Sequence, residues 1–110
     1  NTPVMQNVQL IESLQKCIRE CLNCADSCLD EDNIKKMVPC VRLDRACAET
    51  CQAGANLLAI NATNAREMVQ LCKDICSKCA DECEKHEMDH CKRCGEACRE
   101  CEKACEAYLG

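Results

Sequence analysis

Cysteine dominates the residues of this chain that can do chemistry. Sixteen of the 110 residues are cysteines, and with one exception they follow each other within four groups in steps of three or four residues. Thiols pack as small apolar groups, pair as disulfides or bind soft metal ions. The groups are Cys17, Cys21, Cys24 and Cys28; Cys40, Cys47 and Cys51; Cys72, Cys76, Cys79 and Cys83; and Cys91, Cys94, Cys98, Cys101 and Cys105.

Steps of three and four residues place the cysteines of each group on one face of an α-helix. At about 100° per residue, the first four span an arc of only about 60°, whereas a strand would scatter them over both faces. The exception is the seven-residue step from Cys40 to Cys47, and Asp44 stands inside it where the pattern would place another cysteine. Asp44 is therefore a candidate oxygen ligand, or else the ion-pair partner of a neighbouring arginine.

Four helices are expected to carry the four cysteine groups. Their predicted limits are roughly 3–29, 38–60, 65–84 and 89–108, with polar turns between them. Asn64, followed three residues later by Glu67, resembles a capping box at the start of the third helix. Short connections favour antiparallel neighbours. We therefore predict one all-α domain over residues 1–110, an antiparallel up-down-up-down four-helix bundle with a cysteine-lined core.

This topology gives the two ends of the bundle different chemistry. We expect an apolar plug at one end and a mouth with metal-binding side chains at the other, where His86, Met88 and His90 would lie outside the thiols. The plug would collect Leu10, Leu14, Leu57, Leu58, Met68, Val69, Tyr108 and Leu109. The mouth would collect Cys28, Met37, Cys40, Cys83, His86, Met88, His90 and Cys91.

Several uses of such a cysteine-lined core can be compared. Packing alone does not explain sixteen thiols in register, because leucine would pack better. A disulfide between two cysteines of one helix has strained bridge geometry and removes little chain entropy. Disulfides between helices stay possible, so a disulfide-stapled structural or chaperone bundle is one alternative. Zinc and iron–sulfur clusters usually take their ligands from compact turns, and they stay as a second alternative.

Copper(I) fits a continuous cysteine stripe best. It is a soft ion that prefers thiolate and thioether ligands, and it accepts two or three of them. Neighbouring thiolates can bridge several ions, and monovalent cations neutralise the thiolates as the protons leave. We therefore expect many copper(I) ions on all sixteen cysteines, roughly one per cysteine, with Asp44, His86, Met88 and His90 as further candidate ligands.

Composition argues against other partners. The net charge is −5 with acidic and basic residues interspersed, and Tyr108 is the only aromatic residue, so nucleic acid is a poor partner. No stretch reaches the length of apolar sequence that a membrane span needs. The chain opens Asn1-Thr2-Pro3, without a basic segment followed by an apolar one, so we expect no secretory signal and a cytoplasmic location.

The pattern closely resembles that of the bacterial copper storage proteins, cysteine-rich four-helix bundles that bind many copper(I) ions inside the bundle. Arg42-Leu43-Asp44-Arg45, within residues 40–51, is similar to a signature of that family on the second helix. His86-Glu87-Met88-Asp89-His90-Cys91 is similar to its His-x-His-x-His-Cys motif before the last helix, with Met88 where cytosolic members often have a histidine.

The resemblance implies a cytosolic copper store without catalytic activity. It also implies a homo-oligomer, often a tetramer of bundles. A copper donor or acceptor protein is a candidate partner of such a store.

Overall fold

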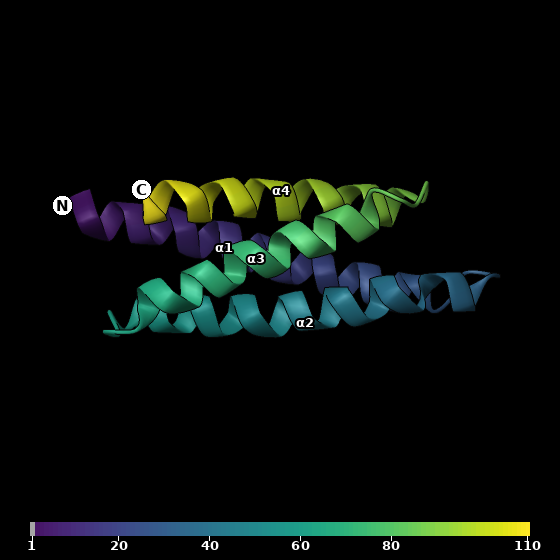
Figure 1. Ribbon diagram of the computed structural model, residues 1–110, viewed down its shortest axis with the longest axis horizontal. Helices are drawn as coiled ribbons and strands as arrows, with labels where there is room; N and C mark the ends of the chain where they lie inside the picture. Colours follow the sequence, from purple (N-terminus) through teal and green to yellow (C-terminus); the bar gives the residue numbers. More distant parts are fainter. Residues whose placement is uncertain (1) are drawn as a thin grey trace.

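Four antiparallel α-helices make up the structure, a computed structural model that describes residues 2–110, with side chains from residue 7 onward. They are α1 (Thr2–Cys28), α2 (Ile34–Ala59), α3 (Ala65–Cys83) and α4 (Asp89–Leu109). Each packs on the next, and α4 returns to α1, so that they form a ring around one axis (Figure 1). The bundle is 49 Å long and 18 by 17 Å across. The predicted up-down-up-down bundle is therefore confirmed.

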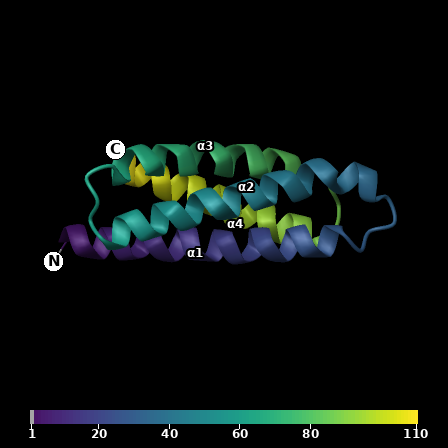
Figure 2. The same ribbon diagram turned by 90° about the horizontal axis from the view of Figure 1, so that it is seen from below.

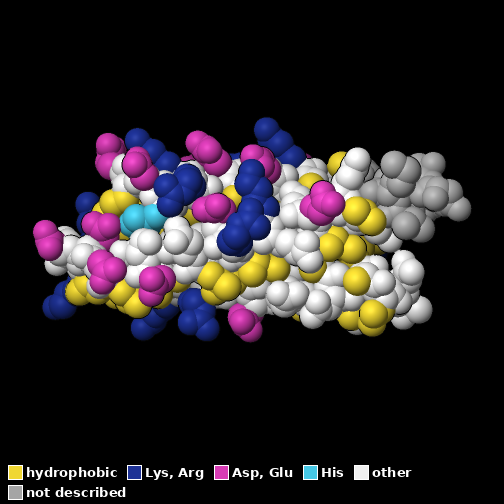
Figure 3. All heavy atoms as spheres, turned by 180° about the vertical axis from the view of Figure 1, so that it is seen from behind, with side chains coloured by type: hydrophobic (Ala, Val, Ile, Leu, Met, Phe, Trp, Pro, Cys, Tyr) yellow, Lys and Arg dark blue, Asp and Glu magenta, His cyan; other side chains and the backbone are white. Residues whose placement is uncertain are grey.

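The connections lie where the predicted topology requires them. Figure 2 shows the segment between α2 and α3 at one end of the bundle and the other two connections at the opposite end. None of the helices among residues 2–110 combines the length and the apolar character that a membrane span needs. On the face seen in Figure 3, acidic and basic side chains are interspersed, as they are in the sequence.

The start of α2 differs from the sequence prediction. The helix begins at Ile34 rather than near residue 38, so that Pro39 lies inside its second turn. There the proline ring removes the backbone hydrogen bond to the carbonyl of Lys35, which lies four residues earlier. The turn between α1 and α2 is correspondingly shorter than expected.

The predicted capping box of α3 is wrong. Asn64 occupies the N-cap position, but its side chain makes no capping hydrogen bond. Its backbone angles of φ −99° and ψ 15° lie outside the extended region that a capping side chain normally needs. The N-cap residues of α2 and α4, Asn33 and Met88, also lack a side-chain cap bond. These helices therefore depend mainly on the packing of their buried faces.

The core changes in composition along the bundle axis. All sixteen cysteines are at most 1% exposed, and they fill the middle of the bundle. Leu10, Leu14, Leu58 and Val69 are buried at the end where α1 begins, which confirms the apolar plug. The other predicted plug residues are half-buried against the same core; they are Leu57, Met68, Tyr108 and Leu109.

We expect the reduced, metal-free protein to be largely helical already. Protonated thiols pack as small apolar groups, so the core can form before any metal binds. Zinc fingers behave differently, because they fold only with their metal. Far-ultraviolet circular dichroism of the reduced protein in the presence of a chelator measures the helix content. A coil spectrum that turned helical on addition of metal would contradict this expectation.

Candidate metal centre

Thiols from all four helices meet along the bundle axis. The Sγ atom of Cys17 on α1 lies 3.7 Å from that of Cys47 on α2 and 3.8 Å from that of Cys76 on α3. It also lies 3.7 Å from the Sγ atom of Cys98 on α4. All sixteen cysteines are free thiols. One sulfur thus contacts the sulfurs of three neighbouring helices, at distances far beyond the roughly 2 Å of a disulfide bond.

The thiols gather in sets of four at successive levels. In each set the four ligand atoms lie within 4.8 Å of one another. Successive sets either share a thiol or are joined through Asp44, whose Oδ1 atom accepts hydrogen bonds from Cys79 and Cys94. The thiols therefore form one continuous column, here called the thiol column, rather than separate sites. From the plug towards the mouth, the sets include Cys17, Cys51, Cys76 and Cys101; Cys17, Cys21, Cys47 and Cys98; Cys21, Cys79, Cys94 and Cys98; Cys24, Cys40, Asp44 and Cys83; and Cys24, Cys28, Cys40 and Cys91.

Asp44 is fully buried within the thiol column. The thiols of Cys79 and Cys94 donate to its Oδ1 atom over 3.2 and 3.3 Å. Arg42 and Arg45, its charged neighbours in sequence, are exposed to solvent. The alternative prediction, an ion pair between Asp44 and a neighbouring arginine, is therefore wrong. The side chain of Asp44 lies where the spacing of the pattern would place a cysteine.

The surroundings of Asp44 favour its neutral form. Burial, reinforced by the nearby cysteines, raises the pKa of Asp44 far above its usual range. A neutral carboxyl group therefore completes the metal-free column. Its ionisation requires a cation close by, as metal ligation would provide.

His90 lies where the thiol column reaches the mouth. Its Nδ1 atom is 3.4 Å from the Sγ atom of Cys24 and 3.6 Å from that of Cys91. Its Nε2 atom is 3.0 Å from a carboxylate oxygen of Glu31. Burial opposes protonation, but the hydrogen bonds with Cys24 and Glu31 outweigh it, and the pKa of His90 is raised. One ring nitrogen thus faces sulfur while a carboxylate orients the ring, as is usual for metal-binding histidines.

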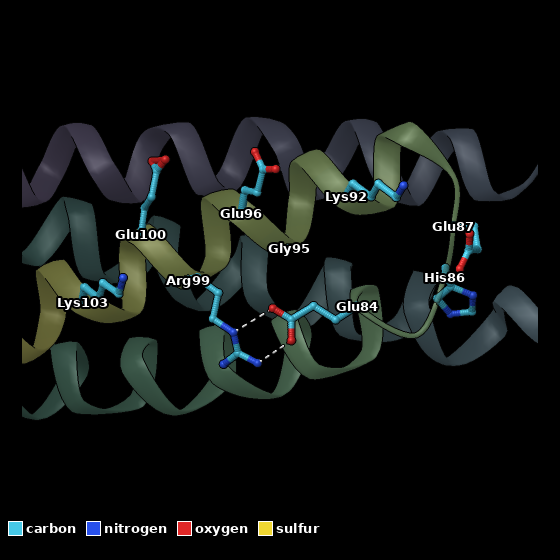
Figure 4. Close-up of a pocket in the computed structure, with 9 residues that line it drawn as sticks. All are labelled: Glu84, His86, Glu87, Lys92, Gly95, Glu96, Arg99, Glu100 and Lys103. Atoms are coloured by element: carbon cyan, nitrogen blue, oxygen red, sulfur yellow. Dashed lines mark hydrogen bonds and ion pairs between the residues drawn. The ribbon is translucent and has the colours of Figure 1, made fainter.

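His86 is placed differently from His90. Its Nε2 atom lies 2.9 Å from a carboxylate oxygen of Glu82, one turn earlier on the chain. The ring lines a surface pocket of about 580 Å³ between the end of α3 and α4, where Arg99 pairs with Glu84 (Figure 4). Met88 is half-buried and packs against the core. The structure therefore brings His90 to the thiols and leaves His86 beside the column.

Two carboxylates at the mouth were not recognised from the sequence. Glu31 belongs to the turn after α1, and its contact with His90 joins residues 59 positions apart. Local sequence holds no signal for such a pairing. Glu82 could have been found, because it precedes His86 by four residues and the two fall on one side of a helical turn.

In the part of the chain that the structure describes, no lysine or arginine is buried with the thiols to balance thiolates. Within the described part of the chain, Asp44 and His86 are the buried side chains of polar or charged type. Burial raises the pKa of Cys28 and of Cys91, and nearby thiolates raise both further. Protons or metal cations must therefore neutralise the column, and a metal that binds takes the place of protons.

Comparison with known proteins agrees with this geometry. The chain matches the sequence profile of the copper storage proteins over residues 4–110. It is 36% identical over 80 residues to YhjQ of Bacillus subtilis (strain 168), which is described as an uncharacterized cysteine-rich protein. The aligned residues make up 73% of this chain and 74% of YhjQ.

Two solved structures have nearly the same fold. The Cu(I)-bound copper storage protein BsCsp3 matches with a TM-score of 0.92 and 33% identity, over 96% of this chain and 99% of the other. A cytosolic copper storage protein from Streptomyces lividans, studied during copper loading, matches with a TM-score of 0.92 and 36% identity, over 97% and 94% of the two chains. The chain belongs to the copper storage protein family.

Proposed function

We propose that this protein stores copper(I) on the thiolates of its thiol column. The observation that carries the proposal is the run of four-ligand sets along the axis, in which thiols such as Cys17, Cys21 and Cys24 each belong to two sets whose ligand atoms lie within 4.8 Å of one another. Shared thiols suit a soft ion of low coordination number, because each sulfur can bridge two ions. The Cu(I)-bound structure of BsCsp3 supports the choice of metal.

The column and the mouth would have different tasks in storage. All sixteen cysteines would hold the stored ions, and Asp44 would add a carboxylate oxygen near the mouth. His90 and Met88 would pass copper between solvent and the outermost thiols, and His86 would be a further ligand beside this route. The proposed ligands are Cys17, Cys21, Cys24, Cys28, Cys40, Cys47, Cys51, Cys72, Cys76, Cys79, Cys83, Cys91, Cys94, Cys98, Cys101, Cys105, Asp44, His86, Met88 and His90.

The plug and the mouth support one direction of copper movement. Buried leucines at the plug offer an ion neither water nor a ligand. At the mouth, the imidazole of His90 lies between Glu31 and Cys24, within hydrogen-bond distance of both. An ion that arrives there can exchange water for nitrogen and then nitrogen for sulfur. We therefore expect uptake and release at the mouth.

The other interpretations fit the geometry less well. Zinc and iron–sulfur clusters use closed sets of ligands, whereas Cys17 and Cys21 each belong to more than one set here. A stapled bundle requires bonded sulfurs, and the Sγ atoms of Cys21 and Cys94 are 3.6 Å apart. Neither alternative gains a specific supporting observation.

Storage without catalysis and a cytosolic location complete the proposal. The Streptomyces lividans protein, at 36% identity, is described as cytosolic. A homo-oligomer is also part of the proposal, because apolar side chains such as Leu22, Ile60 and Leu71 are more than 40% exposed and could pack between copies of the chain. A donor or acceptor protein would exchange copper with the mouth.

The capacity of the column gives the first test of storage. Titration of the reduced protein with copper(I) against a chromogenic chelator should break at roughly 16 ions per chain, on the order of one ion for each cysteine. The loaded protein should be colourless, since copper(I) has a filled d shell. A break at about four ions would support separate tetrahedral sites instead. A brown colour of the protein as purified, before any copper is added, would support iron–sulfur clusters.

Single substitutions at the mouth test the route. His90→Ala should slow copper uptake and release by about tenfold, because it removes the imidazole next to the outer thiols, while capacity stays close to that of the wild type. His86→Ala is the matched control, because it removes a histidine that bonds Glu82 and should change the rates much less. Stopped-flow transfer of copper(I) to a chelator measures both. Unchanged rates in His90→Ala, with faster exchange after Leu14→Ala and Leu58→Ala, would place the route at the plug.

A further inference from the structure

The cysteine face of α2 ends at a buried glycine. Cys40, Asp44, Cys47 and Cys51 follow one another on this face, and the next position in the pattern is Gly54. Glycine is less favourable than alanine inside a helix, because it has more conformational freedom to lose on folding. A buried glycine inside α2, which continues to Ala59, therefore indicates that something else needs the space of its side chain.

The atom that needs this space is the sulfur of Cys72. A Cβ atom built on Gly54 would lie 2.6 Å from the Sγ atom of Cys72 on α3, closer than real Cβ atoms come to other atoms. The next nearest atoms belong to Leu14 and Met68, both at an ordinary 3.8 Å. Alanine at this position would therefore collide with one thiol and with little else.

Cys72 uses the space to approach the backbone of α2. Its thiol donates to the carbonyl oxygen of Thr50, with the sulfur 3.4 Å from that oxygen. Thr50 precedes Gly54 by one turn, so the sulfur lies in a notch on the surface of α2. Cys72 is fully buried in the same core as Cys51 and Cys105, the last cysteines of α2 and α4 before the plug. A side-chain hydrogen bond with Cys51 and burial raise the pKa of Cys72, and the nearby charges of Cys51 and Cys105 raise it further.

We propose that Gly54 is a positioning residue for the innermost copper site. Its missing side chain lets Cys72 extend the thiol column by one further level, beside Cys51 and Cys105, before the plug begins. Gly54 does not touch the metal and acts through Cys72. The proposal rests on the proposed function of copper storage. In it, Gly54 determines how far the copper sites extend along the bundle towards the plug.

Gly95 provides a matched control in the same bundle. It is also buried within a helix, and it faces α3 from α4 beside the pocket of Figure 4. A Cβ atom there would meet the Cβ atom of Cys83 at 3.5 Å and the Cγ atom of Glu84 at 3.6 Å, which are ordinary contacts. Gly95→Ala therefore adds the same methyl group without displacing a thiol.

A double-mutant cycle on the full chain tests this role. Gly54→Ala, Cys72→Ala, the double variant and Gly95→Ala are compared by copper(I) titration, and by thermal unfolding of the reduced, metal-free proteins. Gly54→Ala and Cys72→Ala should each lower the capacity by about one or two ions per chain, and the double variant by no more than Cys72→Ala alone. Gly95→Ala should keep the wild-type capacity. In the metal-free proteins, Gly54→Ala should lower the midpoint temperature of thermal unfolding. Most of that decrease should disappear when Cys72 is also replaced by alanine.

Three results would overturn the proposal. One is a copper(I) capacity of Gly54→Ala equal to that of the wild type, which would mean that Gly54 serves only the packing of the helices. Another is a loss in the double variant equal to the sum of the single losses. The third is failure of both Gly54→Ala and the double variant to fold, because the collision would then not be with Cys72. If Gly54→Ala fails to fold and the double variant folds, the coupling through Cys72 is supported.

The two readouts separate this proposal from the proposed function. A wild-type chain that binds no copper(I) would contradict storage. The unfolding midpoints of the metal-free proteins would still report whether Gly54 and Cys72 are coupled.

Discussion

A buried thiol can lose its proton only if another cation takes the proton's place. An unpaired charge in a protein interior costs far more free energy than a domain of this size can supply, so buried groups change protonation or acquire a partner. Here sixteen thiols and the carboxyl group of Asp44 share one column, and no lysine or arginine is buried with them in the part of the chain that the structure describes. Protons must neutralise the column when it is empty. Monovalent metal ions can do so when it is full, and one ion for each thiolate keeps the interior near neutrality.

The architecture follows from the need to bring many thiols to one axis. A helix with cysteines every three or four residues presents them on one face, and an antiparallel ring of four helices turns those faces inward. Because protonated thiols pack as small apolar groups, one fold can serve both the empty and the filled column. The ends then differ in purpose. Leu14, Leu58 and Val69 close one end, and His90 with Glu31 lies at the other.

Much of this could be predicted from the sequence, because the periodicity of the cysteines defines helix faces directly. The four helices, the apolar plug and the position of Asp44 all followed from it. The backbone between the helices did not. α2 begins four residues earlier than expected, and the side chain of Asn64 forms no cap, because periodicity says little about the angles of turn residues.

Side-chain partners across the bundle also lay beyond the sequence. His86 and His90 are four residues apart and would share a face within one helix, but α3 ends at Cys83 and α4 begins at Asp89. The break turns the two rings towards different partners, Glu82 and Glu31. The contact between Gly54 and Cys72 joins two helices, so neither residue stands out in the sequence alone.

X-ray absorption at the copper K-edge, measured on protein loaded with copper(I), tests the thiol column most directly. Copper shared along overlapping sets of thiolates should show a first shell of about two or three sulfurs, with a second contribution from neighbouring copper ions. A minor oxygen or nitrogen contribution is compatible with ligation near the mouth. A first shell dominated by nitrogen or oxygen, or copper without copper neighbours at full loading, would contradict storage in a continuous column of thiolates.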